Sequence, residues 1–120
     1  MVIIDTLLPS DPDIAEFYQT MEKMRDPTHV RAYNQQEWCQ MAEEAGFQVE
    51  AVRIFNKTHD FPVWAKRAGL NREGVKKLTK YFIDAPAKVH NHFQIETFAG
   101  EVESYTDQKL LLYATRLDKK

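Results

Sequence analysis

The stretch from Asn34 to Ala51 constrains the fold most strongly, because it specifies a helix that leads directly into a strand. Asn34 and Glu37 have the spacing of a capping box, in which each side chain accepts a backbone N–H of the other residue. Apolar residues then recur at helical spacing, at Trp38, Met41, Ala42 and Ala45. Gly46 can supply the left-handed residue that ends a helix, and the alternation from Phe47 to Ala51 is typical of a strand. The sequence therefore predicts α/β architecture.

The segments before this stretch predict a strand and a helix. Val2–Leu8 is an almost continuous apolar run, which is typical of a strand that is covered on both faces inside a parallel sheet. Asp11 followed by Pro12 has the pattern of a helix start. Apolar residues at spacings of three and four then continue to Met24, so we expect a helix that ends before Pro27.

The second half of the chain predicts short helices followed by strands. A strand is expected from about Gln48 to Thr58, and three helices are expected within residues 60–93. Their predicted starts are Asp60, Asn71 and Pro86. The second of them should bury Val75, Leu78, Phe82 and Ile83. After these helices we expect further extended segments, at Gln94–Phe98, Val102–Thr106 and Leu110–Ala114, with a turn at Ala99-Gly100. Residues 1–120 are expected to form one domain.

Composition excludes several classes of function. A net charge of −2 over 120 residues gives no electrostatic footprint for nucleic acid. No apolar run approaches the roughly 20 residues of a membrane-spanning helix, so neither a nucleic acid nor a membrane is expected as a partner. The single cysteine, Cys39, excludes an internal disulfide and suits a reducing compartment, which predicts a cytoplasmic location.

The histidines do not predict a metal site. His90 and His92 are two residues apart, and on a helix their side chains would point roughly 200° apart, so they could not share one ion. His59 precedes Asp60, but that carboxylate is better explained as a helix cap. We therefore expect no metal.

Several motifs resemble class I methyltransferases that use S-adenosylmethionine, and most closely the group similar to ubiquinone/menaquinone biosynthesis methyltransferases. Arg25–Arg31 (RDPTHVR), Glu37-Trp38 and Ala45–Phe47 resemble the region after that family's fifth strand. Val2–Asp5 and Leu110–Ala114 are similar to its fifth and seventh strands. The resemblance covers nearly the whole chain and implies the C-terminal part of a Rossmann-like sheet, with the fifth, sixth and seventh strands and a helical insertion at residues 60–93 that covers the substrate pocket.

The resemblance also implies where a small organic acceptor would bind. Asp5, at the end of the fifth strand, and the loop residues Arg25 and Arg31 would contact the acceptor, together with Tyr18 and with Trp64 of the inserted helices. His29 is the candidate catalytic base, because an unperturbed pKa near 6.5 suits that role. The alternative is that His29 and Arg25 only hydrogen-bond the loop to the sheet edge.

The sequence departs from the family at the cofactor. A complete member has a glycine-rich loop after its first strand, whereas the four glycines here are isolated, at positions 46, 69, 74 and 100. The intact parent would use S-adenosylmethionine, but this chain alone is expected neither to bind it nor to be active.

Two further expectations follow. The alternative function is a non-catalytic module that binds a small ligand or another protein through an aromatic surface. Its rings would be Phe55, Phe61, Trp64, Phe82 and Phe93. A first strand without an upstream neighbour would expose an apolar edge, so we expect a homodimer. It would form by pairing of the first strands across a two-fold axis, or by exchange of the first helix between chains.

Overall fold

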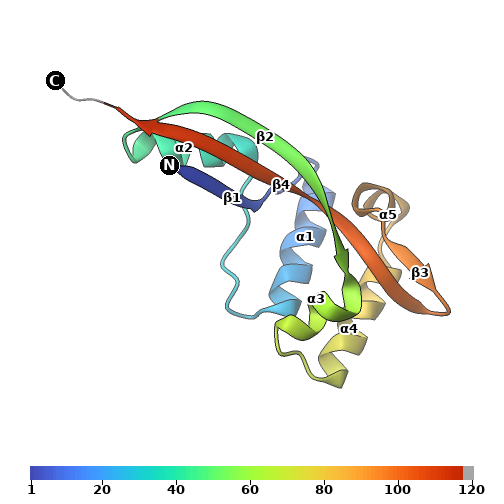
Figure 1. The fold of residues 1–120 in the computed structure, drawn as a ribbon. Coiled ribbons are helices and arrows are strands. Elements are labelled where there is room, and N and C mark those ends of the chain that lie inside the picture. Colours follow the sequence, from blue (N-terminus) through green and yellow to red (C-terminus); the bar gives the residue numbers. More distant parts are fainter. Residues whose placement is uncertain (118–120) are drawn as a thin grey trace. The chain divides into compact units, whose positions relative to one another are not determined.

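The computed structural model describes residues 1–117 (Figure 1). The elements in chain order are β1 (Val2–Thr6), α1 (Pro12–Arg25), α2 (Gln35–Glu44), β2 (Phe47–Asp60), α3 (Phe61–Arg67), α4 (Arg72–Ile83), α5 (Ala87–Phe93), β3 (Glu96–Phe98) and β4 (Glu101–Arg116). They form two compact units. Unit 1 contains residues 1–8, residues 32–57 and the segment from 108 onward, and unit 2 contains residues 9–31 and 58–107. Both long strands, β2 and β4, contribute to each unit, and the expectation of one domain stays a prediction.

The sheet of unit 1 has the strand order β1-β4-β2. β1 runs antiparallel to β4, with Val2 opposite Tyr113 and Thr6 opposite Lys109. The arrows of β2 and β4 also point in opposite directions (Figure 1). The structure is thus mixed α/β with an antiparallel sheet, which confirms the predicted class. A parallel neighbour for the first strand stays a prediction. In the described residues β1 pairs with β4, and Leu7 forms one isolated parallel bridge with Tyr33.

The first strand is also less buried than its sequence suggests. Val2 is 58% exposed and Ile4 is 60% exposed, while Ile3 packs against the core. Successive side chains of a strand point to opposite faces, and α2 covers only one face of this sheet. The prediction of burial on both faces is therefore wrong. Pairing of this strand in a homodimer stays a prediction.

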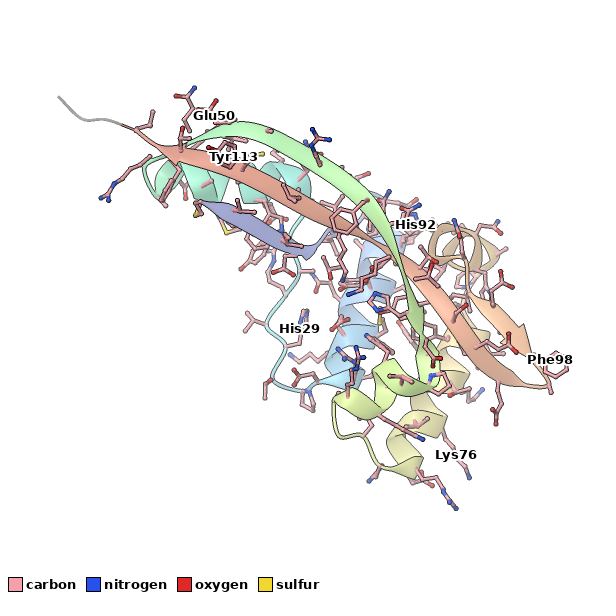
Figure 2. All side chains as sticks on the ribbon, in the orientation of Figure 1. His29, Glu50, Lys76, His92, Phe98 and Tyr113 are labelled. Atoms are coloured by element: carbon pink, nitrogen blue, oxygen red, sulfur yellow. The ribbon has the colours of Figure 1, made fainter. Side chains whose placement is uncertain are left out.

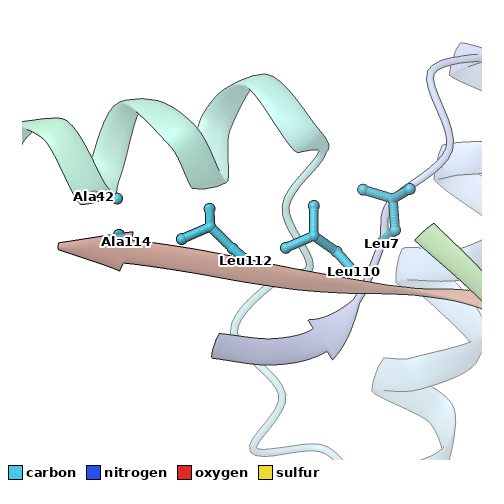
Figure 3. Packing of buried hydrophobic residues seen from close by; sticks show 5 residues of the cluster. All are labelled: Leu7, Ala42, Leu110, Leu112 and Ala114. Atoms are coloured by element: carbon cyan, nitrogen blue, oxygen red, sulfur yellow. The ribbon is translucent and has the colours of Figure 1, made fainter. Parts of the chain in front are cut away.

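The core of unit 1 lies between α2 and one face of β4. Leu110, Leu112 and Ala114 point toward Ala42 of α2, with Leu7 at the end of the row (Figure 3). Around this cluster pack the half-buried Ile3, Trp38, Cys39, Phe47, Val49 and Val52. Alternate residues of one strand thus provide most of the buried surface.

The start and end of α2 are as predicted. Asn34 Oδ1 accepts the Glu37 N–H at 2.9 Å, and Glu37 Oε1 accepts the Asn34 N–H at 3.1 Å. Gly46, with φ of 88°, adopts the left-handed conformation that ends the helix. Ala42 is buried, but Ala45 is exposed, so the apolar stripe ends one turn earlier than its spacing suggested.

Unit 2 is helical, and its helix starts also follow the sequence. Asp11 Oδ1 accepts the Asp13 N–H at 2.9 Å, Asp60 Oδ1 accepts the Val63 N–H at 3.1 Å, and Asn71 Oδ1 accepts the Gly74 N–H at 2.8 Å. α1 packs against α4 and α5. Aromatic side chains fill the interior, with Phe17, Phe61, Phe82, Phe93 and Tyr105 each at most 6% exposed.

Two predictions for unit 2 need correction. β4 is one strand of 16 residues, where two separate segments were expected. Ile83, expected on the buried side of α4, is 37% exposed. Leu78 and Phe82, one turn apart, mark the buried line of this helix, and the next residue is rotated by about 100° away from it.

The turn before β4 is confirmed. Ala99 and Gly100 both have positive φ, of 52° and 78°, as required by the two-residue turn that best fits the twist of a hairpin. Phe98, at the tip of this hairpin, is 72% exposed (Figure 2). Within residues 1–117, no helix combines the length and apolar character needed to cross a bilayer.

Candidate functional site

Three of the predicted acceptor-binding residues lie together in unit 2. Arg25 Nε donates to the backbone carbonyl of Trp64 at 3.1 Å, and its guanidinium carbon lies 4.5 Å from the centroid of the Trp64 ring. Arg25 is also 3.9 Å from Glu22, whose carboxylate accepts the Tyr18 hydroxyl at 3.4 Å. The cation–π contact and the hydrogen bond fix Arg25 over the indole face.

Local structure explains why these side chains meet. Tyr18, Glu22 and Arg25 are spaced by four and then three residues, so they share one face of α1. Trp64 belongs to α3, whose start is fixed by Asp60 and by a proline in its first turn. The alternative interpretation had Arg25 only hydrogen-bonding the loop to the sheet edge. The contacts of Arg25 lie instead on α1 and α3.

The sequence reasoning missed three further residues at this site. His59 lies near the end of β2, and Tyr105 and Asp107 are alternate residues of β4. His59 Nε2 is 3.0 Å from Asp107 Oδ1, and the two side chains are 12% and 2% exposed. The imidazole also stacks on the Tyr105 ring, with centroids 4.8 Å apart and an interplanar angle of 16°.

Tyr105 contacts both His59 and Trp64, so it connects the His59–Asp107 pair with the residues around Arg25. Its ring meets Trp64 edge-to-face, with centroids 4.9 Å apart. Together Tyr18, Glu22, Arg25, His59, Trp64, Tyr105 and Asp107 form what we call the Arg25–His59 cluster. All seven residues belong to unit 2.

The Tyr105 hydroxyl is the most unusual group in this cluster. It is buried, and no residue in the described part of the chain forms a hydrogen bond with it. Burial, followed by the charge of Asp107, raises the pKa of Tyr105, so the hydroxyl stays protonated. An unsatisfied buried hydroxyl costs about 1–3 kcal/mol, and such a group calls for an explanation such as a functional role.

The remaining predicted residues lie elsewhere. His29 Nε2 is 3.2 Å from the side-chain oxygen of Gln19, so its ring contacts α1 (Figure 2). Asp5 is exposed on β1 of unit 1 and accepts the N–H of Thr6 at 2.7 Å. Arg31 is exposed at the end of the loop. The roles assigned to these three residues stay predictions.

The other titratable groups form no metal site in the described chain. His90 Nε2 lies 3.2 Å from the Ile83 carbonyl oxygen, and burial lowers the pKa of His92. Within residues 1–117, no three His, Cys, Asp or Glu side chains are placed to hold an ion.

The aromatic residues do not form the surface that the alternative function needs. Four of the five rings, those of Phe61, Trp64, Phe82 and Phe93, are at most 5% exposed, and only Phe55 is substantially open at 42%. These four rings fill the interior of unit 2. A groove of about 890 Å³ does open between α3, α4 and the β3–β4 turn, and its lining includes Lys66, Val75, Lys76 and Ile83.

The glycines do not fit a cofactor loop. Gly46 and Gly69 follow the ends of α2 and α3, and Gly100 completes the hairpin turn. Gly74 lies in the first turn of α4, where its N–H is already bonded to Asn71. No glycine of this chain therefore remains to cradle a nucleoside, and the residues present do not fit S-adenosylmethionine.

Comparison with known proteins confirms the resemblance to methyltransferases. No family model matches the chain. It is 26% identical over 94 residues to the uncharacterized methyltransferase YcgJ of Bacillus subtilis (strain 168) and 26% identical over 96 residues to the uncharacterized protein YafE of Escherichia coli (strain K12). These matches cover 78% and 80% of this chain but only 37% and 46% of the relatives.

Two solved structures also support the resemblance to methyltransferases. A crystal structure of a protein from Bacillus halodurans C-125, provisionally described as a methyltransferase, matches 94% of this chain with a TM-score of 0.89 and 31% identity. The structure of Bacillus subtilis YcgJ matches 98% of it, also with a TM-score of 0.89, at 23% identity. The chain spans 53% and 51% of these two proteins. It thus corresponds to about half of a methyltransferase of this type.

Proposed function

Because the chain corresponds to about half of such a methyltransferase, we propose that it is the C-terminal, substrate-side portion of an S-adenosylmethionine-dependent enzyme that methylates a small organic acceptor. The observation that carries this proposal is the match over 94% of the chain, at 31% identity, to the Bacillus halodurans protein. The glycines support a donor site outside this chain, since each glycine already has a structural role here. The donor site is then formed by residues outside these 120.

We place the acceptor at the Arg25–His59 cluster. Arg25 supplies a fixed positive charge over an aromatic ring, and Tyr105 supplies a buried hydroxyl that has no hydrogen-bond partner within the described chain. An apolar site with a few convergent polar groups is the usual form of a small-molecule pocket. The helices of residues 60–93 carry Trp64 and would cover the acceptor bound at this cluster.

The proposal has a direct test in two parts. The first is calorimetric titration of the 120-residue chain with S-adenosylhomocysteine, the product form of the donor, which should give no binding heat. Micromolar binding by these residues alone would contradict the assignment of the donor site to another part of the protein.

The second part measures methyl transfer. In the polypeptide encoded by the complete reading frame, transfer of a labelled methyl group to a panel of small acceptors should occur and should fall at least about tenfold with Trp64→Leu or Arg25→Met, since each removes a contact that orients the acceptor. Arg67→Met is the matched control, because Arg67 is an exposed arginine of α3 outside the cluster. Absence of transfer to every acceptor, or equal losses in all three variants, would refute the proposal.

A further inference from the structure

We propose that His59, oriented by Asp107, takes the proton of a hydroxyl group on the acceptor, and that the acceptor is therefore a molecule methylated on oxygen. This inference rests on the proposed function, since it treats the Arg25–His59 cluster as the acceptor site. It goes further by naming the proton-accepting residue and the chemical class of the acceptor.

The geometry assigns the two ring nitrogens of His59 different roles. Nε2 is buried and lies 3.0 Å from the Asp107 carboxylate. In the proposed arrangement this nitrogen carries the proton of the neutral ring, because it faces a negative charge. Nε2 and Asp107 Oδ1 are in close contact but form no hydrogen bond in this structure. The second nitrogen, Nδ1, is then the acceptor, on a side chain that keeps 12% of its surface open.

Stacking restricts how the imidazole can move. The ring lies nearly parallel to Tyr105, at an interplanar angle of 16°, and Tyr105 is itself held edge-to-face against Trp64. A base that is held on two sides loses little freedom when it meets its substrate. The unpartnered Tyr105 hydroxyl lies within the same cluster, and a bound oxygen would satisfy it.

The formal charges of the Arg25–His59 cluster accommodate the proton that His59 would accept in the proposed step. Asp107 and Glu22 each carry one negative charge and Arg25 carries one positive charge, so the cluster has a charge of −1 while His59 is neutral. The remaining titratable members, Tyr18 and Tyr105, are uncharged phenols. A proton transferred from the acceptor to His59 would bring the formal charge of these residues to zero, beside a carboxylate that is only 2% exposed.

The proposed step is a proton transfer that balances without a further reactant. The O–H bond of the acceptor breaks and its electron pair stays on oxygen, which becomes an alkoxide or phenolate. The proton bonds to Nδ1 of His59, which becomes an imidazolium ion facing Asp107. In this scheme His59 touches the acceptor and is a catalytic residue, whereas Asp107 acts through His59 and is a positioning residue.

A chromogenic phenol tests the step without any methyl donor. The probe is para-nitrophenol, whose phenolate absorbs visible light and whose neutral form does not. Bound to the 120-residue chain below the pH at which the free probe ionises, it should show at least about tenfold more phenolate than the free probe, which corresponds to one unit of pKa. His59→Gln should keep binding within about threefold, because glutamine still offers a hydrogen bond, but should lose the phenolate signal.

Three variants act as controls. His90→Gln should change nothing, because His90 bonds a backbone carbonyl of α4 outside the cluster. Loss of the phenolate signal in His29→Gln, with His59→Gln unaffected, would assign the base to His29 and overturn the inference. Tyr105→Phe should weaken probe binding about five- to tenfold, since it removes the hydroxyl that would hydrogen-bond the probe. The protein should stay folded, because that hydroxyl has no hydrogen-bond partner in the described part of the unliganded chain and the ring is kept.

A spectroscopic measurement isolates the positioning role of Asp107. In the unliganded chain at a pH where His59 is neutral, nitrogen chemical shifts of the imidazole should report one tautomer, protonated at Nε2. Asp107→Asn should give a mixture of tautomers. A wild-type ring protonated at Nδ1, or a folded chain that does not bind the probe at millimolar concentration, would overturn the inference.

The two proposals can fail separately. A phenolate signal that depends on His59, in a protein whose complete form transfers no methyl group, would remove the proposed function and leave the proton-accepting site. Methyl transfer to a hydroxyl acceptor that is unchanged by His59→Gln would retain the function and refute the inference.

Discussion

Replacement of Phe82 and of its neighbour Ile83 tests the packing of unit 2, because the two residues were expected to be equally buried and the structure separates them. Phe82 is fully buried, and Ile83 is 37% exposed. The ring centroid of Phe82 lies within 6.0 Å of four other aromatic centroids, those of Phe17, Phe61, Trp64 and Tyr105.

These contacts set the expected magnitudes. Phe82→Ala should lower the free energy of unfolding by about 4–5 kcal/mol, the upper part of the usual range for a buried phenylalanine, because the ring pairs add to the cavity cost. Ile83→Ala should cost less than about 1 kcal/mol, since its side chain is only partly removed from water. Phe82→Leu, at about 1–2 kcal/mol, keeps the test valid if Phe82→Ala does not fold.

Urea unfolding followed by tryptophan fluorescence measures the difference. The chain has two tryptophans, and Trp38→Phe in every variant leaves Trp64 of unit 2 as the single reporter. With a slope of about 1.5 kcal/mol per molar urea, Phe82→Ala should move the midpoint by about 3 M and Ile83→Ala by less than about 0.7 M. Equal midpoints for Phe82→Leu and Ile83→Ala, both far below the parent, would show that α4 presents a different face and would refute this packing.

The remaining predictions concern the cap, the turn and the thiol. Asn34→Ala should cost about 1 kcal/mol of unfolding free energy and Asn34→Asp much less, as measured by urea midpoints with Trp38 as reporter, because only the first variant loses the capping oxygen. Gly100→Ala should destabilise by about 1 kcal/mol, because its φ of 78° strains any residue with a Cβ, whereas Ala99→Gly should be neutral or stabilising in thermal melts. Burial, and then the charge of Glu43, raises the pKa of Cys39, so the thiol is less ionised at neutral pH than a free thiol. Its reaction with a thiol reagent should therefore be slower than that of free cysteine and should rise through a higher pH range, and equal rates in native and urea-unfolded protein would contradict this.

Sequence reasoning succeeded where the signal is local. The capping side chains at Asn34, Asp60 and Asn71 act on backbone groups three residues away, so a few letters of sequence contain the whole interaction. The Ala99-Gly100 turn is equally local. The burial of an element depends on what covers it, and this explains why the two faces of β1 were judged wrongly.

At the candidate site, too, the sequence did not reveal contacts between residues that are far apart in the chain. Tyr18, Arg25 and Trp64 were reached through a family resemblance, and the structure brings them together. His59 and Asp107 are 48 residues apart, and their pairing depends on β2 lying beside β4. A usable signal did exist, since Tyr105 and Asp107 have the spacing of two that places side chains on one face of a strand.

The pairing of β1 with β4 has a consequence for how the protein is made. Thr6 and Lys109, which hydrogen-bond across this pair, are separated by 103 positions in the chain. At synthesis rates of roughly 5–20 residues per second, the first strand emerges from the ribosome some 5–20 seconds before its partner exists. During that interval Val2, Ile3 and Ile4 lack the partner strand β4, and pairing with it closes a loop of about a hundred residues. Nascent chains held at successive lengths should therefore form the β1–β4 pairing only after β4 has emerged.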